Sequence, residues 1–175
     1  MTIAGAGPTG ALLALGLARR HCSVILQDPL SQEQIQARSR AYALTHSSRR
    51  LLERLDLWEP LAEHLIPFQA LRLEDQELHR VVMFGPGDLG GANRGVAAIG
   101  WILDHQPLMA LLFDRLRSEA TVDLRLASQR SPDATGSSRA DLEIACDGPR
   151  SPHRQRWRLP LWSHPYRQGC LTLKV

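Results

Sequence analysis

Six residues near the N-terminus, Gly5-Ala6-Gly7-Pro8-Thr9-Gly10, place three glycines at the spacing GxGxxG. A short apolar stretch precedes them, and the Ala- and Leu-rich segment Ala11–Arg20 follows. We therefore predict a strand, a tight turn and a helix that is apolar on nearly all sides and hence buried. In such a turn Gly5 permits the bend, Gly7 lets the backbone approach a pyrophosphate, and Gly10 lets the helix pack closely against the sheet.

A second strand is predicted at Ser23–Gln27, a β-branched apolar run that Asp28 follows directly. Asp28 stands 18 residues after Gly10, where a carboxylate can accept hydrogen bonds from both ribose hydroxyls of an adenosine. The same carboxylate would repel a 2′-phosphate, which argues against NADP at this position. Pro8 and Thr9 complete the turn at a helix N-terminus, whose free N–H groups favour phosphates. The pattern predicts a dinucleotide site; the alternative is a glycine turn of an unrelated α/β protein.

The rest of the chain continues the mixture of helices and strands. Leucine spacing predicts helices at Ser47–Leu57, Glu59–His64 and Pro107–Arg117. Strands are predicted at Phe68–Glu74, Val81–Phe84, Val96–Leu103, Val122–Leu126 and Asp141–Ala145, and strand character returns at Gly169–Val175. The polar stretch 31–40, the glycine-rich stretch 85–95 and the Ser/Pro/Gly-rich stretch 128–139 carry no such pattern. This order predicts an α/β protein with a small inserted antiparallel sheet at about residues 66–103.

Composition excludes several classes of protein. Apolar residues make up 43% and charged residues 22% of the 175 residues, as in soluble globular proteins. The apolar run Gly10–Ala18 is too short to span a bilayer, and its positive charges follow it, unlike those of a secretory signal. Three widely spaced cysteines and seven scattered histidines show no metal-ligand spacing. We predict no metal site, no disulfide framework and a reducing, cytoplasmic compartment, with the histidines as surface or satisfied polar residues.

Positive charge gathers at the C-terminal end, although the net formal charge is only +3. Residues 148–175 contain six basic residues and no acid: Arg150, Arg154, Arg156, Arg158, Arg167 and Lys174. A basic tail of this kind suits nucleic acid, an acidic lipid surface or a phosphorylated cofactor. Aromatic residues interleaved on a strand platform and known nucleic-acid motifs are missing, so nucleic acid is not the predicted partner.

Four segments, in order, resemble FAD-dependent aromatic-ring hydroxylases, which are flavoprotein monooxygenases. The turn at residues 5–10, with its proline, resembles the opening of these enzymes. The segment Arg40-Ala41-Tyr42-Ala43-Leu44, followed by Leu51–Trp58, is similar to a segment of the ubiquinone-biosynthesis hydroxylases. The segment Asp147-Gly148-Pro149-Arg150-Ser151-Pro152-His153-Arg154 matches the D-G-x-x-S-x-x-R motif at every fixed position. The last segment, Pro165–Gly169, resembles the strand that leads into the substrate domain.

The resemblance implies a Rossmann-like, glutathione-reductase-like FAD/NAD(P)-binding domain at residues 1–160. Residues 161–175 would then begin an inserted, β-rich substrate domain. These enzymes carry a second flavin motif, a G-D-A-A-H-like segment, downstream of D-G, and no such segment occurs in this sequence. We therefore expect the chain to correspond to the N-terminal half of such an enzyme.

The resemblance also implies roles for individual residues. The arginine matching Arg40 lies against the ribose and pyrophosphate of FAD in the family; the alternative is a solvated loop arginine. Asp147 and Gly148 would lie near FAD and the NAD(P)H pyrophosphate, and the arginines of this motif would serve the second nucleotide. The alternative is a plain turn. Gln106 would touch the flavin side, although Met109 stands where relatives often have glutamine.

The activity implied is hydroxylation of a phenolic substrate, with FAD as cofactor and NAD(P)H and O2 as co-substrates. The closest likeness implies a polyprenylated quinone precursor and, with it, peripheral membrane contact. The flavin carries the difficult chemistry, so no catalytic side chain is predicted. The alternatives are an FAD-dependent oxidoreductase that does not hydroxylate, and a truncated remnant that is inactive.

Overall fold

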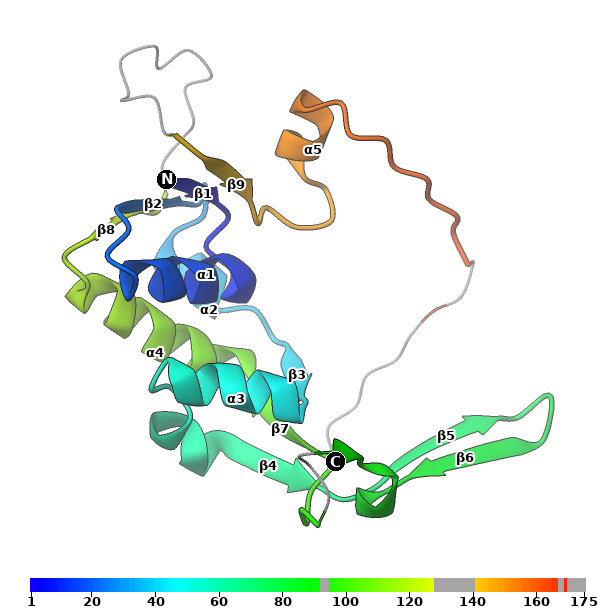
Figure 1. Ribbon diagram of the computed structural model, residues 1–175. Coiled ribbons are helices and arrows are strands. Elements are labelled where there is room, and N and C mark those ends of the chain that lie inside the picture. Colours follow the sequence, from blue (N-terminus) through cyan, green and yellow to red (C-terminus); the bar gives the residue numbers. More distant parts are fainter. Residues whose placement is uncertain (92–94, 128–140, 167–168, 170–175) are drawn as a thin grey trace.

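A four-stranded parallel sheet forms one end of the molecule (Figure 1). The computed structural model describes residues 1–91, 95–127, 141–166 and 169. The strands lie in the order β8-β2-β1-β9: β1 Thr2–Ala4, β2 Val24–Gln27, β8 Val122–Arg125 and β9 Glu143–Ala145. Every neighbouring pair is parallel, so the carboxyl ends of all four strands lie at the same edge. The predicted α/β class is confirmed.

Two helices, α1 (Pro8–Ala18) and α4 (His105–Ser118), pack against each other and against this sheet. Their shared core contains fully buried side chains from both layers: Ile3, Leu15, Leu26, Leu112, Phe113 and Leu116. Burial of each large apolar side chain contributes roughly 1.5–3 kcal/mol to folding. The core therefore fixes α1, and with it the glycine turn, at the carboxyl edge of the sheet.

Helix α1 begins three residues before its predicted start at Ala11. Gly7 is its N-cap, and Pro8, Thr9 and Gly10 form its first turn. Proline suits this first position because its fixed φ matches the helix and its missing N–H has no helical partner there. The second half of the predicted turn is therefore already helical.

A separate three-stranded antiparallel sheet has the order β3-β7-β4. Its strands are β3 Ala41–Leu44, β4 Leu65–Phe68 and β7 Gly100–Asp104. Helix α3 (His46–Arg54) and the 3-10 helix η1 (Glu59–His64) connect β3 to β4, close to the predicted helices. Strand β3 was not predicted: its residues alternate between exposed and half-buried, but the exposed positions hold Ala41 and Ala43 and not polar residues that would reveal the alternation.

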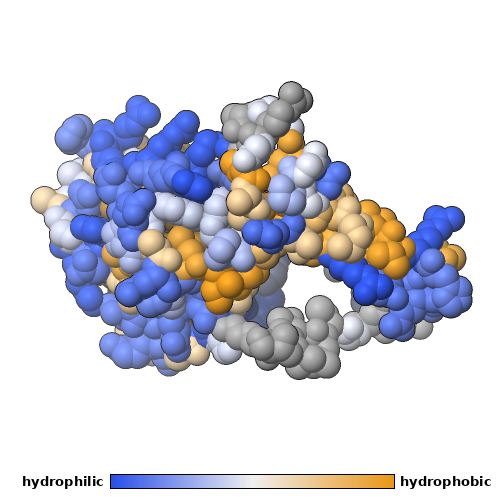
Figure 2. Space-filling view, turned by 90° about the horizontal axis from the view of Figure 1, so that it is seen from below, coloured by the Kyte–Doolittle hydropathy of each residue, from blue (hydrophilic) through white to orange (hydrophobic). Residues whose placement is uncertain are grey.

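Strands β5 (Leu71–Asp75) and β6 (Arg80–Phe84) form a hairpin that projects from the body of the molecule (Figure 1). The antiparallel strands predicted at Phe68–Glu74 and Val81–Phe84 are confirmed as this pair, although the first begins later than predicted, at Leu71, because Phe68 is the end of β4. Seen from below, hydrophobic residues cover much of this arm and hydrophilic residues its end (Figure 2). The short 3-10 helix η2 (Pro86–Asp88) follows the hairpin.

Two short helices, α2 (Gln32–Gln36) and α5 (Pro152–Arg156), were also not predicted. Each begins at a serine cap: the Ser31 hydroxyl accepts from Gln34 N–H, and the Ser151 hydroxyl accepts from Arg154 N–H. A serine cap is a sequence signal for a helix start, and in α2 it forms a capping box with Gln34. The signal was present in both segments, whose polar composition hid it.

Two predicted segments cannot be compared with the structure. The loop predicted at 128–139 and most of the strand predicted at 169–175 lie outside the described residues. Residues 159–166 form neither helix nor strand. Over the described ranges, no helix is both long enough and apolar enough to cross a membrane.

Candidate nucleotide-binding site

The predicted ligand groups meet at the carboxyl edge of the parallel sheet. The glycine turn follows β1, Asp28 follows β2, and Asp147 follows β9 at distant places in the chain. Two adjoining cavities of about 380 Å³ and 530 Å³ open there. Both are lined by Gly5, Asp28, Arg38, Asp147 and Arg150. We refer to the two together as the groove; α/β folds place their ligands at this edge.

The three glycines of the turn differ in how much space surrounds the position of the missing Cβ. Gly5 has φ +100°, and a Cβ there would lie 2.3 Å from the carbonyl oxygen of Cys146. A Cβ at Gly10 would lie 1.9 Å from the Gly5 carbonyl oxygen, so Gly10 serves contact with the turn as well as with the sheet. No atom lies within 4 Å of a Cβ built at Gly7, which lines the groove. The first and third glycines are needed for the fold, and the second leaves open space.

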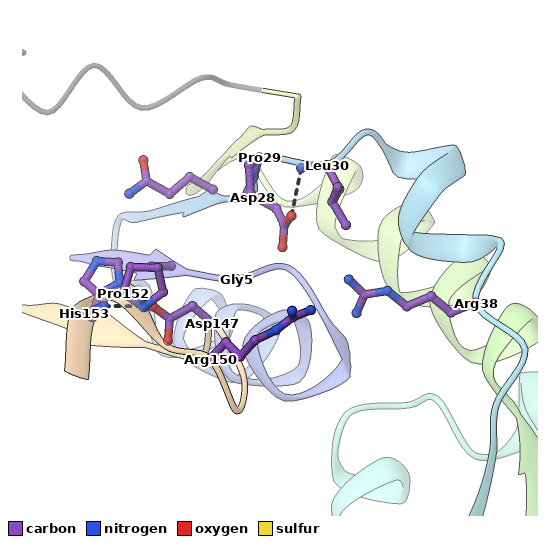
Figure 3. Close-up of a pocket in the computed structure, with 11 residues that line it drawn as sticks. Gly5, Asp28, Pro29, Leu30, Arg38, Asp147, Arg150, Pro152 and His153 are labelled. Carbon is purple, nitrogen blue, oxygen red and sulfur yellow. Dashed lines mark hydrogen bonds and ion pairs between the residues drawn. The ribbon is translucent and has the colours of Figure 1, made fainter. Parts of the chain in front are cut away.

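Asp28 is 9% exposed and lines both cavities (Figure 3). Its Oδ2 accepts from the backbone N–H of Ala6 at 2.8 Å, and its Oδ1 accepts from Leu30 N–H at 2.9 Å. The carboxylate therefore fixes the glycine turn relative to the end of β2. Two carboxylate oxygens offer about four acceptor positions, so accepting these two bonds leaves room for bonds from a ligand.

Three arginines surround the groove: Arg38 and Arg150 line both cavities, and Arg40 lines the larger one. The side chains of Arg38 and Arg150 point toward one another from opposite walls (Figure 3). In the described parts of the chain, none of these three guanidinium groups forms an ion pair with a carboxylate. Guanidinium groups bind phosphate oxygens strongly, so this mouth of the groove is suited to an anion.

The segment that carries Arg38 and Arg40 is held by a buried histidine. His105 Nε2 donates to the Ile35 carbonyl oxygen at 2.7 Å, because a carbonyl can only accept. Its Nδ1 lies 2.7 Å from the Tyr42 hydroxyl, and its backbone N–H donates to the Arg40 carbonyl oxygen at 2.8 Å. Burial raises the pKa of the Tyr42 phenol. His105 thus ties α2, β3 and α4 together beside the groove.

On the opposite wall, Asp147 is bound to the first turn of α5. Its Oδ2 lies 2.5 Å from His153 Nδ1 and accepts from His153 N–H at 3.2 Å. Burial acts to raise the pKa of the Asp147 carboxyl, but hydrogen bonds from Ser151 and His153 outweigh it and hold the pKa below its ordinary value. Asp147 is therefore an ionised carboxylate in the groove wall.

The groove unites nearly all the predicted site residues. Gly5, Gly7, Pro8, Thr9, Asp28, Arg40, Asp147 and Gly148 line one or both cavities. Gly10 lies one layer behind, against Gly5. Gln106 lies exposed on the first turn of α4 and lines neither cavity.

Arg38 and His153 line the groove but were not predicted as ligand groups. Arg150 belongs to the D-G segment, whose arginines were expected to serve the second nucleotide, and it lines both cavities. Arg38 stands in the polar stretch between α2 and β3, where no local pattern marks it as a ligand group. His153 was interpreted as one of the scattered surface or satisfied polar histidines. It is a satisfied polar residue, 1% exposed and bonded to Asp147, and it also lines the groove.

Within the described residues, no cluster of three or more His, Cys, Asp or Glu side chains could hold a metal ion. Cys22 and Cys146 are both free thiols. The groove therefore offers backbone N–H groups, carboxylates and guanidinium groups as its polar contacts.

No family model matches the chain. A curated protein of Synechocystis, the uncharacterized protein slr1300, is 26% identical over 112 residues, which make up 64% of this chain and 26% of that protein. The chain thus spans about a quarter of the length of the curated relative it matches.

Solved structures share the fold at low sequence identity. PqsL, a probable FAD-dependent monooxygenase from Pseudomonas aeruginosa, matches 94% of this chain with a TM-score of 0.67 and 18% identity. PieE, a flavin-dependent monooxygenase solved with FAD and substrate, matches 90% with a TM-score of 0.65 and 19% identity. The Diels-Alderase PyrE3 matches 91% with a TM-score of 0.70 and 20% identity. The chain covers 47%, 31% and 34% of these proteins, so the likeness concerns less than half of each.

Proposed function

We propose that this chain is the FAD-binding portion of an NAD(P)H-dependent flavoprotein monooxygenase that hydroxylates a phenolic substrate. The observation that carries the proposal is the convergence of the glycine turn, Asp28 and the three arginines Arg38, Arg40 and Arg150 in one groove. The similar fold of PqsL and PieE, both flavin monooxygenases by description, supports the same conclusion. A polyprenylated quinone precursor as substrate and peripheral membrane contact follow only from the sequence resemblance.

The proposal includes a division of the chain. Residues 1–160 would be a Rossmann-like FAD/NAD(P)-binding domain of the glutathione-reductase type, with the small inserted sheet at about 66–103. Residues 161–175 would begin the substrate domain. Parallel strands, helices packed on the sheet and a ligand groove at the carboxyl edge support this assignment.

The residues present fit the adenosine and pyrophosphate parts of FAD. A ligand backbone can approach Gly7 because no protein atom fills the space of its missing Cβ. The N-terminus of α1 directs free N–H groups and partial positive charge to the same place. Asp28 would accept from the ribose hydroxyls, while Arg38 and Arg40 would neutralise the pyrophosphate.

When bound, FAD would supply the redox chemistry, taking electrons from NAD(P)H and activating O2 for the aromatic substrate. The residues of this chain would bind and orient the cofactor. Asp147 and Gly148, at the end of β9, would position its central part, and Arg150 would face the second nucleotide. Gln106, outside the groove, would lie toward the flavin ring.

The experiment is a fluorescence titration of the chain with FAD at neutral pH, comparing wild type with Asp28→Ala. Loss of a charged acceptor for hydrogen bonds removes roughly 1.5–3 kcal/mol, so we expect the affinity for FAD to fall about tenfold or more. Asp114→Ala is the matched control, since it removes an exposed carboxylate from α4, away from the groove.

The second variant is Gly7→Val, whose branched side chain would occupy the space proposed for the pyrophosphate. We expect binding to be abolished while circular dichroism shows the fold retained, since nothing lies within 4 Å of a Cβ there. Equal FAD affinity in wild type and Asp28→Ala, or FAD bound by Gly7→Val, would refute the assignment of the groove.

A further inference from the structure

A buried histidine holds the segment that carries two arginines of the groove. The segment runs from the end of α2 to the start of β3, and residues 38–40 within it belong to neither helix nor strand. From it the side chain of Arg38 reaches toward the groove (Figure 3), and Arg40 lines the larger cavity. The contacts that fix this segment therefore determine where two guanidinium groups lie.

His105, the first residue of α4, bonds to this part of the chain at three points. Its Nε2 donates to the Ile35 carbonyl oxygen at 2.7 Å, and its backbone N–H donates to the Arg40 carbonyl oxygen at 2.8 Å. Its Nδ1 lies 2.7 Å from the Tyr42 hydroxyl. One residue thus holds the chain on both sides of Arg38 and at Arg40 itself.

The bond to Ile35 lies inside the core. His105 is 1% exposed and Ile35 is 0% exposed. A carbonyl in the last turn of a helix has no partner within that helix, and leaving it unpaired in the core is costly. Because a carbonyl only accepts, Nε2 carries a proton, whereas the Tyr42 hydroxyl can either donate to Nδ1 or accept from it. The three bonds are therefore compatible with both the neutral and the charged ring.

The Tyr42 side chain lies near both arginines. Burial raises the pKa of its phenol, while the positive charges of Arg40 and Arg38 act to lower it. The Tyr42 ring packs against the His105 ring at 5.9 Å between centroids. Removing the hydroxyl alone would therefore break one of the three bonds and leave the ring packing in place.

We propose that His105 and Tyr42 are positioning residues of the nucleotide site, which hold Arg38 and Arg40 where they bind the phosphates of the cofactor. The inference rests on the proposed function of the groove. Neither His105 nor Tyr42 lines either cavity, so both would act through the arginines. A segment that is already held in place loses less conformational freedom when its guanidinium groups bind a phosphate.

The first test measures the segment without any ligand. Hydrogen exchange of the backbone amides of residues 36–40 is compared between the wild type and Tyr42→Phe. We expect faster exchange in this segment and unchanged exchange in α1. Tyr166→Phe is the matched control, since it removes the same hydroxyl from a side chain that is 85% exposed. Equal exchange in the wild type and Tyr42→Phe overturns the proposal.

The second test is a double-mutant cycle on FAD affinity. In the wild-type background, Tyr42→Phe should weaken FAD binding about two- to tenfold, since it removes one hydrogen bond. In a background with Arg38→Gln and Arg40→Gln, the same substitution should leave the affinity unchanged. A merely structural role would weaken binding by the same factor in both backgrounds, and that result overturns the proposal.

His105→Phe extends the cycle, because it removes both side-chain bonds and keeps the backbone N–H that donates to Arg40. We expect a larger loss of FAD affinity than in Tyr42→Phe, again only where the arginines are present. If His105→Phe does not fold, Tyr42→Phe keeps the test decisive. Absence of FAD binding by the folded wild-type chain refutes the proposed function as well, whereas binding with equal factors in both backgrounds refutes only the positioning role.

Discussion

The parallel sheet and the β5–β6 hairpin differ in how far their apolar side chains are buried. Leu112 and its neighbours between α4 and the sheet are fully buried, whereas every residue of β5 and β6 is exposed. Cross-strand register puts Leu71, Leu73, Val82 and Phe84 on one face of the hairpin. Within the described ranges, the hairpin forms its own two-stranded sheet, and such a hairpin alone is marginally stable in water.

This difference shows that the groove is held in place by the core next to it and not by the hairpin. The core between α1, α4 and the parallel sheet fixes all three strand ends that line it. The hairpin contributes no residue to either cavity. Changes in the sheet region should therefore affect both stability and binding, and changes in the hairpin should affect neither strongly.

The largest effect is expected within the glycine turn itself. In Gly10→Ala the new Cβ would lie 1.9 Å from the Gly5 carbonyl oxygen, a backbone atom that cannot move without disturbing the turn. We expect the free energy of unfolding to fall by more than about 3 kcal/mol. Gly7→Ala should change it by no more than about 1 kcal/mol, since its Cβ meets nothing. Urea unfolding measures both, and equal losses would contradict the distinction between the glycines.

A truncation in each region tests the comparison directly. Leu112→Ala removes a fully buried side chain and should lower the free energy of unfolding by about 2–5 kcal/mol. Val82→Ala removes a side chain that is 49% exposed and should lower it by less than about 1 kcal/mol. Thermal unfolding gives both values. A large loss in Val82→Ala would mean that the hairpin face is covered in solution.

The smallest effect concerns acid stability. The pKa of Glu143 is lowered by its bond with Arg156, so its contribution to stability is present above about pH 4.5 and is lost as pH falls through the lowered value. Arg156→Gln should therefore make unfolding less dependent on pH in that acidic window. Arg72→Gln breaks the exposed Arg72–Glu74 pair of the hairpin and is the control. Acid titrations followed by circular dichroism compare them, and identical shifts in both variants would argue against a special role for Arg156.

Local patterns were enough to predict the part of the site that comes first in the chain, namely the glycine turn and Asp28. Strand, glycine turn, helix and Asp28 lie within the first 28 residues, and each depends on neighbours in sequence. The apolar run Ser23–Gln27 predicted β2 because a strand buried on both faces needs no alternation. The fold class followed from the order of such segments.

Other features depend on contacts between distant residues. The helices α2 and α5 had local signals in their serine caps, which the polar composition hid. The local signal for the start of α1 was Pro8, a residue that suits the first helical position. Strand β3 had no such signal, since only pairing with β7, some 60 residues later, makes it a strand.

The sequence by itself determined that this chain has an α/β fold with a glycine turn and an acidic residue at the next strand end. Only the tertiary structure decided that Arg38 and Arg150 face each other across the groove and that His153 lies between Asp147 and Glu143. The physical reason is that turns and strands follow from the chemistry of adjacent residues. Which charged side chains meet at the carboxyl edge of the parallel sheet depends on which distant segments the buried core brings together.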